Sequence, residues 1–284
     1  MNDSISTKQK KLAEILLREK KLLVAFSGGV DSTFLLVSAV RVLGKDNVVA
    51  FIERGDVYPA QEITRARRFA RSLGVKTVVS DADCLKNPEF VRNSPERCFF
   101  CKKDLFAKMQ ETADTLGIRC LADGSNADDM RDFRPGAKAK RIFGVRSPLE
   151  EAGLTKEEIR HLSRKMGLPT WDKPAMACLA SRIPYGQHIT QERLVRIRKA
   201  EEFLRQSGFS QVRVRDHQAI ARIEIVPGEF QKAVASSEKI VRRLKGLGYL
   251  HVVLDLEGYT AGSMNRALGK KEYVMHVYRT KRRQ

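Results

Sequence analysis

Leu22-Leu23-Val24-Ala25-Phe26-Ser27-Gly28-Gly29-Val30-Asp31-Ser32-Thr33-Phe34-Leu35-Leu36 is the stretch that decides the fold. Its first five residues are apolar and predict a short, fully buried strand. Two glycines follow, and an apolar-periodic segment from Phe34 to Val42 predicts a helix. Because glycine lacks a Cβ, Gly28 and Gly29 let a ligand approach the backbone closely. The N–H groups and positive dipole end of the next helix favour an anion, so the stretch predicts a phosphate-binding loop.

The loop differs from the common nucleoside-triphosphatase loop, which reads Gly-x-x-x-x-Gly-Lys-Ser/Thr. No lysine lies between Gly28 and Thr33. The run Ser-Gly-Gly-x-Asp-Ser at 27–32 instead resembles the pyrophosphate loop (PP-loop) of ATP pyrophosphatases, which cleave ATP to AMP and pyrophosphate. An ordinary strand–turn–helix with a Gly-Gly turn is the alternative. The resemblance implies that Asp31 faces Mg2+, and that the ATP-binding residues are Ala25, Ser27, Gly28, Gly29, Asp31, Ser32, Asp123 and Gly124.

The length of 284 residues predicts about two domains. Hydrophobic residues make up 42% of the chain and charged residues 31%, a normal mixture for a folded protein. The apolar runs are far shorter than the ~20 residues of a membrane span, and residues 1–9 contain no signal-peptide core. We therefore expect a cytoplasmic protein without a membrane partner.

The net charge of +19, from 53 basic and 34 acidic residues, suggests a polyanionic partner. Nucleic acid and phosphorylated small molecules both fit this charge. A basic proteome or a thermophile's lysine-rich surface would explain it equally well. The basic tail at 279–283 is short enough to be a solvated chain end.

Strands predicted at 22–26, 48–52, 77–80 and 118–123 alternate with helices. This alternation predicts an α/β fold, a doubly wound parallel sheet with its ligand at the carboxyl ends of the strands. Asp123-Gly124 lies at such an end, so we expect it beside the PP-loop. A capping box at 155–158 begins a further helix, and the unperiodic residues 171–186 predict a long functional loop.

The pattern changes from Thr190 onward. Helices at 191–207 and 229–247 accompany half-exposed strands at 212–215, 221–226 and 251–256, which predicts a small α+β domain. We predict a PP-loop ATP-binding domain with the cysteine site over residues 1–186. We assign residues 187–284 to a C-terminal substrate-binding or oligomerisation domain.

The five cysteines are an odd number, which argues against a disulfide framework. Ser94-Pro95 predicts a helix start that places Cys98 and Cys101 on one face, about 5–6 Å apart at Cβ. Nearby cations should favour their thiolates: Arg97, Lys102 and Lys103. Helix-face packing, zinc binding and a dithiol redox pair are the alternatives. Cys84 and Cys120 have no partner spacing and are expected in the core.

With these segments identified, the chain resembles the LarE family of PP-loop sulfur transferases along nearly its whole length. The matching segments are 26–32, Asp123-Gly124, Arg134-Pro135-Gly136, Ser181 to Gly186 with the upstream Cys178, Val212 to Arg215, Ala221 to Glu224, and Leu254 to Tyr259. The PP-loop is common to the superfamily. The Pro184-Tyr185-Gly186 loop and the paired arginines Arg213 and Arg215 are much more specific to the LarE family.

The resemblance implies an ATP-dependent transferase in nickel-pincer nucleotide cofactor biosynthesis. Such an enzyme adenylates a carboxylate of pyridinium-3,5-biscarboxylic acid mononucleotide and replaces oxygen by sulfur. It implies catalytic roles for Cys178, Asp31, Arg213 and Arg215, and substrate binding by Ser181, Arg182, Arg213 and Arg215. It further implies a phosphorylated small-molecule substrate, no nucleic acid, and a homo-oligomer, reported in the family as a hexamer.

The sulfur source depends on the branch of the family. In one branch the cysteine at the Cys178 position gives up its own sulfur. The three cysteines Cys98, Cys101 and Cys178 resemble the branch that carries a 4Fe–4S cluster, in which one iron has no protein ligand. The implied cofactors are ATP, Mg2+ and this cluster. The sulfide source is not identified by the sequence.

Two other functions remain open at this point. A tRNA thiolation enzyme of the same superfamily also pairs a PP-loop with three cluster cysteines, and the charge suits RNA. A non-catalytic RNA-binding protein with a vestigial nucleotide fold is the other, although the intact Asp31 and Ser32 weigh against it. The strands of the second domain carry polar residues at alternate positions: Arg213, Arg215, Arg222 and Glu224. These residues form either a solvated sheet face or a basic surface that binds a phosphorylated ligand.

Overall fold

The chain forms two units in a computed structural model that describes residues 2–131, 135–174 and 177–260. The first unit comprises Met1–Cys84 and Cys98–Met176, and the second comprises Leu85–Arg97 and Ala177–Gln284. The division thus lies between residues 176 and 177 rather than between 186 and 187, and a segment from the middle of the first domain joins the second unit.

A four-stranded parallel sheet with the order β3-β2-β1-β4 is the centre of the first unit. Its strands are β1 (Leu22–Ala25), β2 (Val48–Arg54), β3 (Lys76–Asp81) and β4 (Cys120–Ala122). The strand order changes direction at β1, which pairs with β2 on one side and β4 on the other. In a doubly wound sheet this switch point is where ligands bind, and the predicted fold class is confirmed.

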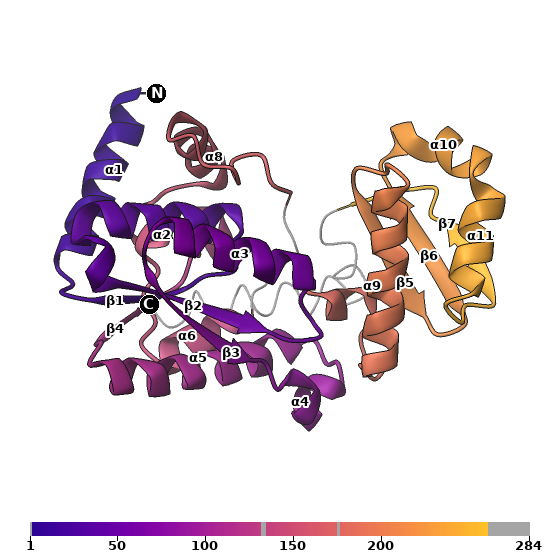
Figure 1. Ribbon diagram of the computed structural model, residues 1–284, viewed down its shortest axis with the longest axis horizontal. Coiled ribbons are helices and arrows are strands. Elements are labelled where there is room, and N and C mark those ends of the chain that lie inside the picture. Colours follow the sequence, from indigo (N-terminus) through magenta and orange to yellow (C-terminus); the bar gives the residue numbers. More distant parts are fainter. Residues whose placement is uncertain (1, 132–134, 175–176, 261–284) are drawn as a thin grey trace. The chain divides into compact units, whose positions relative to one another are not determined.

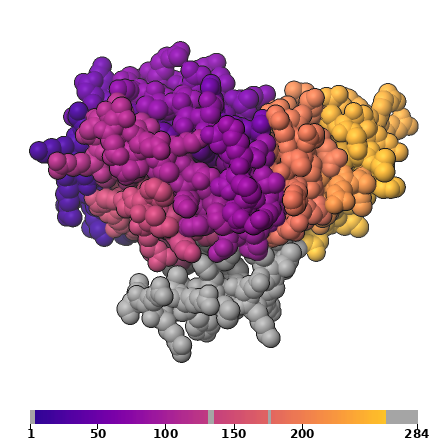
Figure 2. Space-filling view, turned by 90° about the horizontal axis from the view of Figure 1, so that it is seen from below, coloured from indigo at the N-terminus to yellow at the C-terminus, as the bar shows by residue number. Residues whose placement is uncertain are grey.

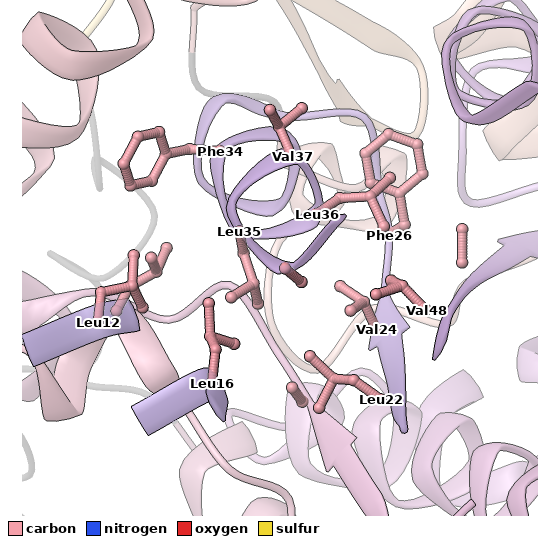
Figure 3. Packing of buried hydrophobic residues seen from close by; sticks show 14 of the residues in the cluster. Leu12, Leu16, Leu22, Val24, Phe26, Phe34, Leu35, Leu36, Val37 and Val48 are labelled. Atoms are coloured by element: carbon pink, nitrogen blue, oxygen red, sulfur yellow. The ribbon is translucent and has the colours of Figure 1, made fainter. Parts of the chain in front are cut away.

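Helices cover both faces of this sheet because its strand residues alternate between two apolar clusters. Leu22 and Val24 pack with α1, α2, α3 and α8, and Figure 3 shows Leu12, Leu16 and Leu35 in the same cluster. Leu23 and its neighbours pack with α5 and α6 on the other face (Figure 1). Figure 2 shows the outer surface of the α5 and α6 layer in magenta. The helices are α1 (Asn2–Leu17), α2 (Val30–Leu43), α3 (Ala60–Ser72), α5 (Arg97–Leu116), α6 (Gly136–Ile142), α7 (Pro148–Glu151) and α8 (Lys156–Lys165).

The second unit is a three-stranded sheet with the order β5-β6-β7 and helices packed on one face. β5 and β6 are antiparallel, whereas β6 and β7 are parallel. This is the small α+β arrangement predicted from the sequence. Its elements are α4 (Pro88–Val91), α9 (Gln191–Gln206), β5 (Val212–His217), β6 (Ile220–Ile225), α10 (Phe230–Ala235), α11 (Ser237–Lys245) and β7 (His251–Leu254).

The segment from Leu85 to Arg97 joins the second unit through one buried asparagine. The Asn93 amide donates to the carbonyls of Ile183, Pro184 and Gln187 at 2.7–3.2 Å. Asn93 has a φ of 55°, a left-handed conformation that asparagine tolerates better than most residues. These bonds tie the segment to the Pro-Tyr-Gly loop, which explains why the two fall in the same unit.

Two predictions of local structure are wrong. Ser94-Pro95 does not begin a helix, because α5 starts at Arg97, and the cap with a following proline is instead Asn87-Pro88 at α4. The predicted helix at 229–247 breaks at Ser236 into α10 and α11. No element was predicted at 136–142, where the chain forms α6 with the buried Ala139.

Some predictions concern residues outside the described ranges. Arg134, Ala175, Met176 and the basic tail at 279–283 belong to this group. Within the described ranges, none of the helices has the length and apolarity that crossing a bilayer requires.

Candidate active site

The PP-loop follows β1 and is shaped by its glycines and two serines. Gly28 has a φ of +69°, and a Cβ there would lie 2.9 Å from that of Ala66, so only glycine fits without strain. The hydroxyls of Ser27 and Ser32 lie 3.1 Å apart, and Ser32 also donates to the carbonyl of Gly29 at 3.3 Å. No side chain caps the start of α2 at Gly29. The predicted loop residues therefore lie together around a helix N-terminus suited to an anion.

Asp31, in the first turn of α2, has the features of a cation ligand. One carboxylate oxygen is paired with the ammonium group of Lys156. The other oxygen, Oδ1, is buried and has no hydrogen-bond partner among the described residues. An orphaned buried carboxylate oxygen is costly unless it binds a cation, so Asp31 fits the Mg2+ that the sequence predicts.

A lysine of α8 lies beside the PP-loop. Lys156 is the first residue of that helix, which begins with a capping box formed by Thr155 and Glu158. Its backbone N–H donates to Asp128 at 2.8 Å, which fixes the helix start, and its side chain reaches Asp31. Sequence reasoning missed Lys156 because it is 125 positions from Asp31. The capping box predicts where the helix starts, but it does not indicate that Asp31 lies beside that start.

A second lysine, Lys173, braces the loop from the opposite end of the first unit's sequence. Its ammonium group donates to the carbonyl of Gly28 at 2.8 Å and pairs with Glu62 on α3. The guanidinium of Arg160 in turn donates to the carbonyls of Trp171 and Lys173 at 2.7 Å. Trp171 and Lys173 are thereby anchored beside the PP-loop.

The loop after β4 lies directly against the PP-loop, as predicted. A Cβ on Gly124 would lie 2.9 Å from the backbone nitrogen of Ser32, so glycine permits this close approach. Asp123 is buried, and its carboxylate accepts from the hydroxyls of Ser125 at 2.8 Å and Ser147 at 2.7 Å. These bonds hold Asp123 and Gly124 at the switch point of the sheet.

Cys98 and Cys101 lie in the first turns of α5, but their surroundings differ from the prediction. Cys98 is exposed, whereas the thiol of Cys101 lies 3.7 Å from that of Cys84 and 4.0 Å from the Tyr58 hydroxyl. The hydrogen bond with Cys84, followed by burial, raises the pKa of Cys101 well above its usual value. The expectation that nearby cations favour this thiolate is therefore wrong.

Two of the expected cations, Arg97 and Lys102, do not bring the pKa of Cys101 below its usual value. Arg97 is buried and donates to Asn93 and to the carbonyl of Ala180 at 3.1 Å, all within the second unit. Lys102 lowers the pKa of Cys101, but the hydrogen bond with Cys84 and burial raise it more. Cys84 and Cys120 are both buried as predicted, but Cys84 has a thiol partner that the sequence did not indicate.

Cys178 begins the short turn Leu179–Arg182 in the second unit, and Arg182 holds it. The buried Arg182 donates to the carbonyls of Ala177 at 2.8 Å and Cys178 at 3.1 Å, and to the Ser181 hydroxyl at 2.9 Å. It is fixed by the buried Glu201, at 2.7 Å. Burial alone would raise the pKa of Glu201, but Arg182 and Arg205 lower it overall, so the pair is ionic.

Arg213 and Arg215 of β5 lie on the sheet face opposite the apolar core, and both are only 6% exposed. Arg215 makes two hydrogen bonds to Glu224, at 2.7 and 2.8 Å, and donates to the Ser181 carbonyl at 2.9 Å. Arg213 lies 5.2 Å from the ring centre of Tyr259. Burial and the neighbouring Arg182 lower the pKa of Arg213. This face is covered at Arg213, Arg215 and Glu224, so these three residues do not form a solvated sheet face.

We expect Arg215→Ala to lower the free energy of unfolding by about 3–5 kcal/mol, because it leaves Glu224 buried without its bidentate partner. Urea denaturation followed by circular dichroism measures this. Arg222 also contacts Glu224 but is 37% exposed, so Arg222→Ala should cost only ~0–1 kcal/mol. Equal losses for the two variants would contradict a structural role specific to Arg215.

Within residues 2–131, 135–174 and 177–260, no group of three histidine, cysteine or acidic side chains is arranged to hold a metal ion. Cys98 and Cys101 belong to the first unit, and Cys178 belongs to the second. The proposed ligand set therefore remains a prediction.

Comparison with known proteins identifies the family. A family profile described as NAD synthase matches residues 5–93, the region of the PP-loop. An uncharacterized protein of Synechocystis sp. is 41% identical over 94% of this chain and 100% of its own length. The pyridinium-3,5-bisthiocarboxylic acid mononucleotide synthase of Lactiplantibacillus plantarum is 35% identical over 95% of this chain and 98% of its own. The chain belongs to the LarE family of PP-loop sulfur transferases.

As a LarE-family member, the protein is an enzyme, an ATP-dependent sulfur transferase that forms AMP and pyrophosphate. A tRNA-specific 2-thiouridylase of Xanthobacter autotrophicus is also similar, at 28% identity, but over only 54% of this chain and 49% of that enzyme. The near full-length match therefore favours LarE over the tRNA thiolation alternative. The family predicted from the motifs is confirmed.

Proposed function

We propose that this LarE-family enzyme acts on pyridinium-3,5-biscarboxylic acid mononucleotide, adenylating a carboxylate and replacing oxygen by sulfur in nickel-pincer nucleotide cofactor biosynthesis. The observation that carries the proposal is the 35% identity, over 95% of the chain, to a synthase named for the bisthiocarboxylic product. The assembled PP-loop supports it, because activation of a poor electrophile such as a carboxylate needs an ATP site.

In the first half-reaction, the substrate carboxylate attacks the α-phosphorus of ATP, and pyrophosphate leaves. Ser27, Gly29 and Ser32 hold the pyrophosphate portion at the start of α2. Asp31 is the residue that would hold Mg2+, which when bound stabilises charge on the departing pyrophosphate. Lys156, which is paired with Asp31 here, would offer its positive charge to the phosphates when Asp31 holds the metal.

In the second half-reaction, a sulfur nucleophile attacks the acyl carbon and AMP leaves. We propose that Cys98, Cys101 and Cys178 hold a 4Fe–4S cluster, since thiolates are the donors that such clusters take. When bound, the cluster would supply the sulfide. Cys101 would serve as a ligand only after losing its hydrogen bond with Cys84 and its proton. Arg182 positions the backbone of Cys178 for this role.

Arg213 is the residue of the second unit best suited to the anionic substrate. Its pKa is lowered by burial and by Arg182, so an approaching phosphate or carboxylate would relieve the excess positive charge. Ser181, Arg182 and Arg215 support this site through the contacts described above. The hexameric assembly and the unidentified sulfide source remain predictions from the family resemblance.

The test is reconstitution with the purified chain, ATP, Mg2+, sulfide and the biscarboxylic mononucleotide under anaerobic conditions. We expect AMP and pyrophosphate in equal amounts and a product heavier by the replacement of oxygen with sulfur. Pyrophosphate release that requires added tRNA, with no thiolated mononucleotide, would overturn the substrate assignment.

Lys156→Ala should weaken ATP binding by about 10–100-fold, because one charge-assisted contact is lost. Isothermal titration with a non-hydrolysable ATP analogue measures the affinity. Lys165→Ala is the matched control, since Lys165 is an exposed lysine at the other end of the same helix. Unchanged affinity in Lys156→Ala would show that this lysine only pairs with Asp31 in the empty site.

A further inference from the structure

The one thiol–thiol contact recorded among the described residues is between Cys84 and Cys101, not within the Cys-x-x-Cys pair. Their sulfurs lie 3.7 Å apart. A disulfide needs about 2.05 Å, so the sulfurs must approach by roughly 1.7 Å. Cys84 is in the short turn Cys84–Lys86 after β3, and Cys101 is in an early turn of α5.

The two cysteines of the pair differ in exposure and in their neighbours. Cys84 is buried at 3% exposure, and Cys101 is partly exposed. The Tyr58 hydroxyl lies 4.0 Å from the Cys101 sulfur and donates to Glu53 at 2.7 Å. A small oxidant therefore meets Cys101 first, and Cys84 is the thiol in contact with it.

The pair also lies where the chain leaves the first unit and where it returns. Cys84 is the last residue of the first unit before the chain passes into Leu85–Arg97, and Cys98 is the first residue after its return. A bond between positions 84 and 101 would join the outgoing and returning chain within the same unit. Because both cysteines belong to the first unit, the disulfide would not require Leu85–Arg97 to leave the second unit.

We propose that Cys84 and Cys101 are an oxidation site, which hydrogen peroxide converts to an intramolecular disulfide. The Cys101 thiol loses its proton and its sulfur attacks one peroxide oxygen; an S–O bond forms, the O–O bond breaks, and the other oxygen takes up that proton and leaves as water, giving a sulfenic acid. The Cys84 sulfur then attacks the Cys101 sulfur, forming the S–S bond and releasing the second water. Two thiol protons end in the two waters, and the peroxide takes up the two electrons that the sulfurs lose.

The consequence for sulfur transfer rests on the proposed function. A Cys101 sulfur held in a disulfide cannot ligate iron, so oxidation removes one of the three proposed cluster ligands. A thiol reductant would return it. The enzyme would then accept a cluster only when its surroundings are reducing, and Cys84 would be the residue that confers this dependence.

The experiment treats the full-length, metal-free chain with hydrogen peroxide, alkylates remaining thiols, and maps tryptic peptides by mass spectrometry. We expect a cross-link between peptide 77–86, which contains Cys84, and peptide 98–102, which contains Cys101. It should persist in Cys98→Ser and Cys120→Ser and disappear in Cys84→Ser. A Cys98–Cys101 linkage in the wild-type chain, or no cross-link in Cys98→Ser, would overturn the proposal.

Iron uptake from ferrous iron and sulfide separates this proposal from the cluster assignment. The oxidised wild-type chain should bind at least about tenfold less iron than the reduced chain, and dithiothreitol should restore binding. If the reduced chain binds no iron while the 84–101 cross-link forms, the cluster assignment fails and the oxidation site stands. If the cross-linked chain binds iron as well as the reduced one, the proposed effect on the cluster is wrong.

Discussion

Asp31→Asn should lower pyrophosphate release by about 10²–10³-fold or more, while the chain remains folded. The substitution keeps the shape of the side chain but removes its negative charge, including that on the buried oxygen that has no partner among the described residues. It also removes the ion pair with Lys156, which is partly exposed and contributes little to stability. A coupled pyrophosphate assay measures the rate, and thermal denaturation checks the fold.

Asp46→Asn is the control for this prediction, because Asp46 is an exposed carboxylate in the turn after α2. Its pyrophosphate release should equal that of the wild-type enzyme. Normal release by a folded Asp31→Asn enzyme would remove Asp31 from the catalytic site. Loss of pyrophosphate release together with a lower unfolding temperature would instead indicate that the variant is misfolded. Pyrophosphate release by a folded Asp31→Glu enzyme, which keeps the negative charge, would then show whether the charge at this position is required.

Cys178→Ser should abolish sulfur transfer while ATP is still cleaved in the presence of substrate. The hydroxyl of serine is a poor ligand for iron and a poor sulfur donor, but the PP-loop belongs to the other unit. Anaerobically prepared wild-type enzyme should contain about four irons per chain, and each of Cys98→Ser, Cys101→Ser and Cys178→Ser should contain fewer. Iron analysis, pyrophosphate release and product mass are the three measurements.

Cys120→Ser provides the control, since Cys120 is buried in β4 away from the predicted ligands. Its iron content should be that of the wild type, as should that of Cys84→Ser under reducing conditions. A single turnover by iron-free enzyme that converts Cys178 to dehydroalanine, with full activity in Cys98→Ser, would show that the protein itself is the sulfur source.

The sequence was sufficient where the physical signal is local. The apolar run before Gly28 and the periodic run after Asp31 describe a strand, a turn and a helix within fifteen residues, and these formed as expected. The same holds for Asp123-Gly124, because parallel strands end at one edge of a sheet. Ser94-Pro95 failed because Asn87-Pro88, a few positions earlier, has the same cap chemistry and is the pair that forms a helix start.

The remaining site residues depend on tertiary contacts that a linear pattern does not encode. Lys156 reaches Asp31 from another helix, and Cys84 reaches Cys101 from a turn. The alternation in β5 correctly indicated one apolar face, but it could not reveal that the opposite face is covered and that Arg215 is paired with Glu224 there. Spacing shows which side chains share a face, and packing decides what that face meets.

The passage of Leu85–Arg97 into the second unit has a consequence for how such enzymes can evolve. The fully buried Asn93 and Phe90, at 0% and 1% exposure, belong to this segment. A single recombination event near residue 177 would exchange the rest of the second unit and replace the loop whose carbonyls the Asn93 side chain binds. Exchange of the whole second unit between lineages therefore requires replacement of two separate stretches of the gene at once, those encoding Leu85–Arg97 and Ala177–Gln284. We therefore expect the two units to be inherited together.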